Sequence, residues 1–127
     1  MSAVLLDVNA LVAWEHSGSP HHKRFHVWAS KRGARNFRTC AIAELGFIRV
    51  SMQVFGYSLD DASKALGELR AHTGGFIETA PHPELQAWAS TANKTTDAYL
   101  IQIARAHRAK LATFDTGISD SAAELIS

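Results

Sequence analysis

Cysteine is nearly absent from this chain, since Cys40 is the only one among 127 residues. No disulfide can form within the chain, which favours a cytoplasmic protein over a secreted one. A lone cysteine in an apolar stretch usually serves packing, which argues against Cys40 as a catalytic nucleophile. His21, His22 and His26 are clustered, but they lack cysteine partners and an HExxH pattern. A zinc site is therefore not expected.

Long apolar runs are also missing. The first apolar segment is short and ends at Leu6. It follows no basic segment and is too short for a signal peptide or a membrane span. Mean hydropathy is near zero, and 46% of the residues are hydrophobic. Both values argue against disorder and for an ordinary globular core. Without repeats, low-complexity tracts or linkers, residues 1–127 are expected to form a single domain.

The chain has no marked excess of either sign of charge, since its net charge is only +1. The basic residues nevertheless gather between positions 21 and 49, where Glu44 is the only acid. They are Lys23, Arg24, Lys31, Arg32, Arg35, Arg38 and Arg49. Such a segment can face the phosphates of a nucleic acid. A solvated helix face with its loop is the simpler reading of the segment taken alone.

Short apolar segments alternate with helical patterns along the chain. Strands are predicted at residues 3–6, 36–39, 76–79, 111–114 and, more weakly, 124–126. Helices are predicted at 9–15, from Pro20 to about 31, at 40–55, from Ser58 to Gly74, and from a cap at Thr95 or Thr96 to about 109. Pro81 and Pro83 bracket a turn that leads into 84–92. This alternation predicts an α/β three-layer sandwich, with a central, mostly parallel sheet flanked by helices.

The clearest helix, 40–55, has one apolar face by spacing. Its members are Ala41, Leu45, Ile48, Met52 and Phe55. Glu44 lies roughly 60° from Ala41 on the helical wheel and therefore borders this expected buried face. With Thr39 or Cys40 as the N-cap, Glu44 is too far inside the helix for a capping box. A simple structural role for this acid is thus hard to find.

Three aspartates join Glu44 in places where a charge is costly. Asp7 and Asp115 directly follow predicted strands, and Asp97 begins an apolar stripe in the first turn of a helix. Ligands of parallel sheets bind beyond the carboxyl ends of the strands, so these acids are predicted to meet at one edge. Each aspartate also has an ordinary role: Asp7 or Asn9 as a helix cap, Asp115 in an Asx turn, and Asp97 as a complement to the helix dipole. Taken singly, these ordinary roles are at least as good.

Converging carboxylates repel one another, and a divalent cation allows them to stay ionised together. Hard oxygen ligands favour Mg²⁺ or Mn²⁺ over zinc. Such an ion can activate water and stabilise charge on a phosphodiester. With a basic surface nearby, the pattern predicts hydrolysis of a nucleic acid.

The order of these motifs resembles the PIN domain, and within it the VapC-type toxins of bacterial toxin–antitoxin pairs. Leu5-Leu6-Asp7-Val8-Asn9 resembles the first acidic motif of the family, and Ala43-Glu44-Leu45 the second. Thr96-Asp97-Ala98-Tyr99-Leu100 resembles the third, and Ala112-Thr113-Phe114-Asp115 the fourth. The likeness covers almost the whole chain, and the ordered set is more specific than any one motif.

The resemblance implies a metal-dependent endoribonuclease. Asp7, Glu44, Asp97 and Asp115 would then be catalytic and would hold one or two Mg²⁺ ions, with Mn²⁺ as a substitute. Asn9 and Thr113 match polar positions that support the acids. The family also implies RNA as substrate, a homodimer, and inhibition by a small cognate antitoxin. Some members carry a further acid just after the fourth, but Thr116 and Gly117 stand there. The more distant Asp120 is interpreted as a turn or helix-start residue.

Two other functions fit the residues. One is a nucleic-acid-binding module with a PIN-like fold and a degenerate site, although binding alone gains nothing from four acids. The other is a metal-dependent phosphatase that acts on small substrates. The basic segment favours a polymer, and Lys23, Arg24, Arg32, Arg35 and Arg38 are its candidate RNA contacts.

Overall fold

The computed structural model describes residues 2–127 and contains, within them, a five-stranded sheet in the order β3-β2-β1-β4-β5. All pairings of neighbouring strands are parallel, so the predicted α/β class is confirmed. The strands are β1 (Val4–Leu6), β2 (Phe37–Cys40), β3 (Gly75–Ile77), β4 (Lys110–Thr113) and β5 (Ala123–Leu125). The strand order reverses beside β1, as it does in doubly wound folds.

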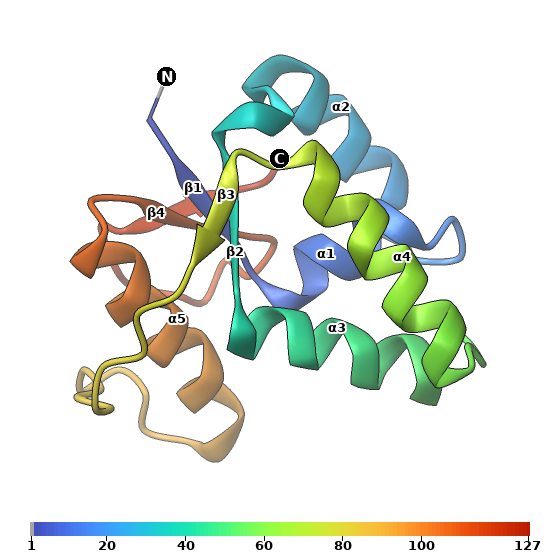
Figure 1. Cartoon of the computed structure of the whole chain (residues 1–127). Coiled ribbons are helices and arrows are strands. Elements are labelled where there is room, and N and C mark those ends of the chain that lie inside the picture. The colour runs from blue at the N-terminus through green and yellow to red at the C-terminus, as the bar shows by residue number, and fades with distance from the viewer. Residues whose placement is uncertain (1) are drawn as a thin grey trace.

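Helices cover both faces of this sheet (Figure 1). They are α1 (Val8–Glu15), α2 (His22–Arg32), α3 (Ala41–Gln53), α4 (Leu59–His72) and α5 (Thr95–Ala106), with short 3₁₀ turns η1 (Ala34–Asn36) and η2 (Ala92–Lys94). Figure 1 shows α1 to α4 gathered on one side of the sheet and α5 on the other. The three-layer arrangement therefore follows the prediction.

The core forms where β1 and its neighbours meet the helices. Val4, Leu5 and Leu6 of β1 are fully buried, as are the aromatic rings of Phe25 and Phe37. A continuous apolar strand of this kind is expected when both faces of a parallel sheet are covered. No helix within residues 2–127 has both the length and the apolar character needed to cross a membrane.

The buried face of α3 differs from the one that spacing predicts. Leu45 is 65% exposed and Met52 41% exposed, whereas Ala43, Gly46 and Phe47 are buried. The reason is a close helix contact: a Cβ atom on Gly46 would lie 2.5 Å from Cγ2 of Val8 in α1. Ala43 and Gly46 let the two helices approach beside the buried ring of Phe47, and Leu45 and Met52 face outward. Glu44 consequently lies on the buried face itself.

One local prediction also needs correction. Neither Thr95 nor Thr96 caps α5: the N-cap is Lys94, and the Thr95 hydroxyl instead donates to the carbonyl of Ala92. Residues 84–91, which follow the turn at Pro81 and Pro83, form no helix or strand before η2 begins at Ala92. Of the two residues considered as the cap of α1, Asp7 is the one that caps it. Ser58, where the next helix was expected to begin, caps α4, and each side chain accepts a bond from a backbone N–H.

Candidate functional site

Three neighbouring strands direct the candidate acids to the carboxyl edge of the sheet. Asp7 follows β1, Asp115 lies just beyond β4, and Glu44 is in the first turn of α3 after β2. Asp97 is in the first turn of α5. The strand order places β1 between β2 and β4, so this edge coincides with the reversal of the sheet. Parallel sheets bind ligands at such points.

Asp7 is the most buried of these acids, with only 2% of its surface exposed. Its Oδ1 accepts a hydrogen bond of 2.7 Å from the N–H of Ala10, and the Thr113 hydroxyl also donates to its carboxylate. The pKa of Asp7 is raised from an ordinary 3.8 to about 7. Burial is the largest cause, the charges of Asp97 and Asp115 act in the same direction, and the two hydrogen bonds oppose them. Asp7 therefore caps α1, while burial and the neighbouring charges destabilise its ionised form.

Asp97 and Asp115 interact electrostatically with each other and with Asp7. Burial first, and then the charge of Asp115, raise the pKa of the Asp97 carboxyl. Asp115 is exposed and forms an Asx turn, in which its Oδ1 accepts a 2.7 Å bond from the N–H of Gly117. Its own N–H donates to Oγ1 of Thr113 at 3.1 Å. Thr113, itself buried, therefore connects Asp7 with Asp115.

The three aspartates suit a divalent cation by their chemistry. They are oxygen donors whose mutual repulsion a cation would relieve. Within residues 2–127, however, no three acidic, histidine or cysteine side chains converge closely enough to hold a metal ion as they stand. Side-chain rotation would be needed to complete coordination.

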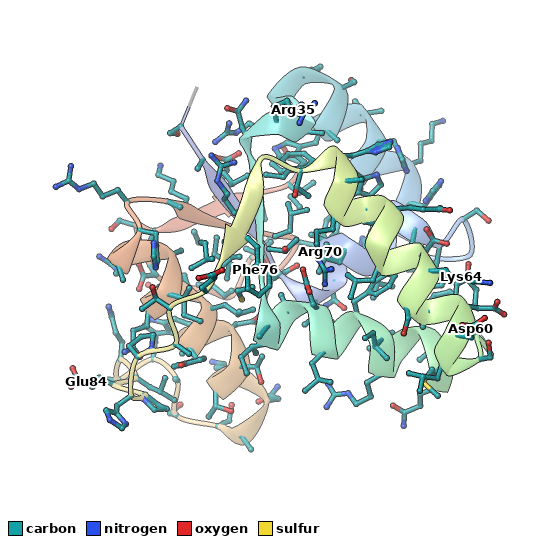
Figure 2. All side chains as sticks on the ribbon, viewed as in Figure 1. Arg35, Asp60, Lys64, Arg70, Phe76 and Glu84 are labelled. Carbon is teal, nitrogen blue, oxygen red and sulfur yellow. The ribbon has the colours of Figure 1, made fainter. Side chains whose placement is uncertain are left out.

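Glu44 is arranged differently, because its carboxylate is already paired. It is 6% exposed, and its Oε2 accepts a 2.6 Å bond from the hydroxyl of Thr39. Arg70 of α4 donates to both carboxylate oxygens, from Nη2 to Oε1 at 2.5 Å and from Nε to Oε2 at 3.1 Å. Figure 2 shows Arg70 pointing from α4 toward α3. The fourth acid is therefore neutralised from within the chain.

The remaining polar candidates take separate positions. Asn9 is an exposed residue in the first turn of α1. Asp120 accepts a 2.9 Å bond from the N–H of Ala122 and pairs with Arg105. Burial favours the neutral form of Asp120, but these bonds outweigh it and lower its pKa. Its role in a turn before β5 agrees with the prediction.

The basic candidates do not form one surface. Arg24 lies over the ring of Phe114, 5.0 Å from its centroid, which places it beside Asp115. Lys23 is exposed in the same first turn of α2. Arg32 instead pairs with Glu124 of β5 at 2.9 Å.

Arg35 and Arg38 lie before and within β2, toward the opposite edge of the sheet from the aspartates. Arg38 donates to the carbonyl of Arg35 at 3.0 Å. Only the start of α2 therefore brings predicted RNA contacts close to the acids.

Sequence reasoning missed Arg70, Phe114 and His21. The His21 ring stacks on Phe114 with centroids 4.4 Å apart, at the edge of the acidic site. No spacing rule links Arg70 to Glu44, which is 26 residues away. The only signal was that Arg70 directly follows Leu69, on the border of the buried face of α4.

Comparison with known proteins agrees with this architecture. The family model described as the PIN domain matches residues 4–124. This chain belongs to the PIN-domain family. The match covers almost the entire sequence and confirms the resemblance to the PIN domain that the motifs indicated.

Within the PIN family, the chain is homologous to VapC ribonucleases of Mycobacterium tuberculosis. Ribonuclease VapC38 of strain H37Rv is 34% identical over 122 residues, which cover 90% of this chain and 86% of the relative. Ribonuclease VapC44 of the same strain is 30% identical, with 91% and 87% covered. Ribonuclease VapC39 is 29% identical, with 93% and 92% covered. The alignments therefore span most of this chain and most of each relative.

Proposed function

We propose that this PIN protein is a metal-dependent endoribonuclease, the toxin of a type II toxin–antitoxin pair. The observation that carries the proposal is the electrostatic coupling of Asp7, Asp97 and Asp115 at the carboxyl edge of the sheet. Like charges held close together beside a buried carboxylate such as Asp7 are unfavourable in a folded chain unless a function retains them. Homology to VapC ribonucleases supports the same activity.

Asp7, Asp97 and Asp115 would hold Mg²⁺, or Mn²⁺ in its place, with Glu44 as a fourth ligand once it is released from Arg70. The bound ion would supply Lewis-acid stabilisation of charge on the phosphate. The Thr113 hydroxyl would orient both aspartates, because it donates to the Asp7 carboxylate and its oxygen accepts from the backbone N–H of Asp115. Asn9, exposed in the first turn of α1 two residues after the Asp7 cap, would be a supporting polar residue.

Hydrolysis would use water as the nucleophile. The water oxygen bonds to phosphorus while the bond from phosphorus to the 3′ oxygen breaks, and an aspartate oxygen orients the attacking water. The released 3′ oxygen takes up a proton. The products carry 5′-phosphate and 3′-hydroxyl ends, whereas metal-independent attack by the 2′ hydroxyl would leave cyclic 2′,3′-phosphates.

RNA would approach along the start of α2. Arg24 and Lys23 supply positive charge there, and the stacked rings of His21 and Phe114 offer a flat surface beside Asp115. Arginine and aromatic faces are common contacts for single-stranded RNA. Arg32, Arg35 and Arg38 lie farther from the acids and would contact only distant parts of a long substrate.

Two protein partners complete the proposal. The exposed apolar side chains of α3, among them Leu45 and Met52, support a homodimer through this helix. A small antitoxin that covers the acidic edge would inhibit the enzyme. Both partners follow from the family, and the exposed face of α3 supports the first.

The decisive test is cleavage of an RNA pool by purified protein with Mg²⁺, with Mn²⁺ and with a chelator. Asp97→Asn should lower cleavage by about two orders of magnitude or more, because a metal-binding charge is lost. Asp60→Asn, which removes an exposed carboxylate of α4, is the matched control and should cleave normally. Unchanged cleavage by folded Asp97→Asn protein would show that the site is wrong.

A nucleic-acid-binding module without catalysis is the second candidate. One observation favours it: Glu44 is ion-paired to Arg70 rather than turned toward the aspartates. Metal titration separates the two functions. RNA binding without any Mg²⁺ or Mn²⁺ binding would support the module.

A further inference from the structure

The ring of His21 is held in place at the start of α2. It stacks on the ring of Phe114, with centroids 4.4 Å apart and planes 15° from parallel. Its Nδ1 lies 2.5 Å from Nη2 of Arg24, whose guanidinium in turn lies 5.0 Å from the centre of the Phe114 ring. The backbone N–H of His21 donates to Oγ of Ser19 at 3.2 Å. The orientation of this half-buried ring is therefore fixed by its neighbours.

The contact with Arg24 determines which nitrogen of His21 carries a proton. A guanidinium can only donate hydrogen bonds, so Nδ1 of His21 accepts one, and the proton of the neutral ring is on Nε2. Nε2 itself has no hydrogen-bond partner within residues 2–127. His21 is the N-cap residue of α2, but its side chain makes no capping bond. The ring thus presents a donor that the fold does not use.

This cluster adjoins the acidic edge of the sheet. Phe114 directly follows β4 and lies between Thr113 and Asp115 in the chain. Neighbouring Cα atoms are about 3.8 Å apart, so the stack of His21 and Phe114 begins one residue from Asp115. Arg24, the charged member of the cluster, is exposed to solvent. A ligand on the stack would be close to any phosphate on which the acids act.

The cluster suits a ligand with a flat face, a hydrogen-bond acceptor at its edge and a negative charge nearby. An unpaired nucleotide combines all three in its base and its phosphate. Aromatic side chains and arginine planes stack on such bases in RNA complexes. A base within an A-form duplex is stacked on its neighbours, and the narrow major groove hides its edge. The cluster therefore distinguishes an unpaired base from a paired one.

We propose that His21 and Phe114 form a binding site for one unpaired RNA base beside the phosphate to be cleaved. The base stacks on the two rings and accepts a hydrogen bond from Nε2 of His21, while Arg24 holds the ring in the required tautomer. This inference rests on the proposed function because it takes RNA as the substrate. It narrows that substrate to an RNA with an unpaired base at the cleavage point, wherever the metal binds.

Fluorescence anisotropy with a chelator present measures RNA binding without cleavage. The probes are a short labelled single strand of random sequence and a labelled duplex of the same length. His21→Ala should bind the single strand about tenfold more weakly than wild type, because one stacked base is lost. It should bind the duplex as wild type does. The matched control is His72→Ala, which removes an exposed histidine at the end of α4, before β3 begins at the opposite edge of the sheet. It should change neither affinity.

Equal binding of the single strand by wild type and His21→Ala would overturn the base site. An equal loss on both probes would mean that His21 contacts the RNA backbone, and the base site would again be wrong. Phe114→Leu covers the case in which His21→Ala does not fold. It keeps an apolar side chain but removes the flat ring, so it should also weaken binding of the single strand, and unchanged binding would contradict the site.

His21→Phe separates stacking from the hydrogen bond, because phenylalanine keeps a flat ring and has no donor. It should bind the single strand more tightly than His21→Ala and more weakly than wild type. Binding as weak as that of His21→Ala would overturn the stacking of the base. Binding equal to that of wild type would overturn the hydrogen bond from Nε2.

The base site and the proposed nuclease fail in different ways. If wild type cleaves RNA and Asp97→Asn does not, while His21→Ala binds the single strand as wild type does, only the base site is wrong. If the expected binding results are obtained but wild type cleaves no RNA with Mg²⁺ or Mn²⁺, the base site stands and the nuclease is wrong. If wild type binds neither probe, both proposals are wrong.

Discussion

Asp7 shows how one residue serves both fold and site. It caps α1 through the N–H of Ala10, receives the Thr113 hydroxyl, and lies close enough to Asp97 and Asp115 to feel their charges. The capping role needs only an oxygen acceptor, whereas the metal role needs the negative charge. Replacing the carboxylate by an amide separates these roles, because asparagine is also a good N-cap.

Asp7→Asn should stabilise the metal-free protein at neutral and alkaline pH. Because the pKa of Asp7 is raised from 3.8 to about 7 in the folded chain, the unfolded chain releases its proton first. Wild-type stability therefore falls as pH rises through this window, and the loss is complete above the folded pKa. The variant, which has no such proton, should be more stable by on the order of 2–4 kcal/mol at alkaline pH.

Urea unfolding with a chelator present, at acidic and at alkaline pH, measures this difference. Near pH 3 both side chains are neutral in both states, so the two proteins should unfold at the same urea concentration. An advantage of Asp7→Asn that is equally large at both pH values would contradict the electrostatic cause. The same variant should lose RNA cleavage, since the charge that holds the cation is gone.

At the scale of elements, the contact between α1 and α3 decides which face of α3 is buried. Gly46 has no Cβ and lets Val8 approach, and α3 turns Ala43, Glu44 and Phe47 inward as a result. This rotation carries Glu44 to the side of Arg70. It also leaves Leu45 outward, where sequence spacing had placed the core.

Gly46→Ala should destabilise the protein, because the added methyl would lie 2.5 Å from Cγ2 of Val8. Overpacking of this kind typically costs about 1–3 kcal/mol. Gly67→Ala is the control on α4, where an added Cβ meets no atom within 4 Å. It should stabilise by roughly 0.5–1 kcal/mol through helix propensity. Urea unfolding that ranks the two variants in the reverse order would contradict the packing.

At the scale of the whole molecule, α3 has one face turned toward the core and one face turned toward solvent. Its inner face holds Glu44 near the acidic edge, and its outer face exposes Leu45 and Met52. Ile42, 38% exposed, extends the outer face. A large apolar patch on a folded domain marks an interaction surface, and the proposed homodimer would bury it.

Leu45→Glu should convert the proposed homodimer into a monomer, because a charge would be buried in an apolar interface. Sedimentation velocity at micromolar concentration measures the change. Val27→Glu on α2 is the control, since Val27 is also an exposed apolar residue, 49% accessible, on another helix. A wild-type monomer, or a Leu45→Glu dimer, would exclude α3 as the interface.

The sequence by itself determined the parts that depend on neighbours along the chain. The alternation of strands and helices, the caps at Asp7 and Ser58, and the Asx turn at Asp115 all rest on contacts within a few residues. The position of Asp7 and Asp115 at one edge follows from parallel strands alone, because their carboxyl ends coincide. That much of the candidate site could be predicted.

Only the tertiary structure decided which face of α3 is buried and which partner Glu44 has. Helical spacing identifies an apolar stripe, but the close approach of Val8 to Gly46 outweighs it. Arg70 reaches Glu44 from another helix, and Arg32 is drawn away to Glu124, 92 residues distant. Such pairings depend on three-dimensional packing between distant segments, and no local pattern in the chain specifies them.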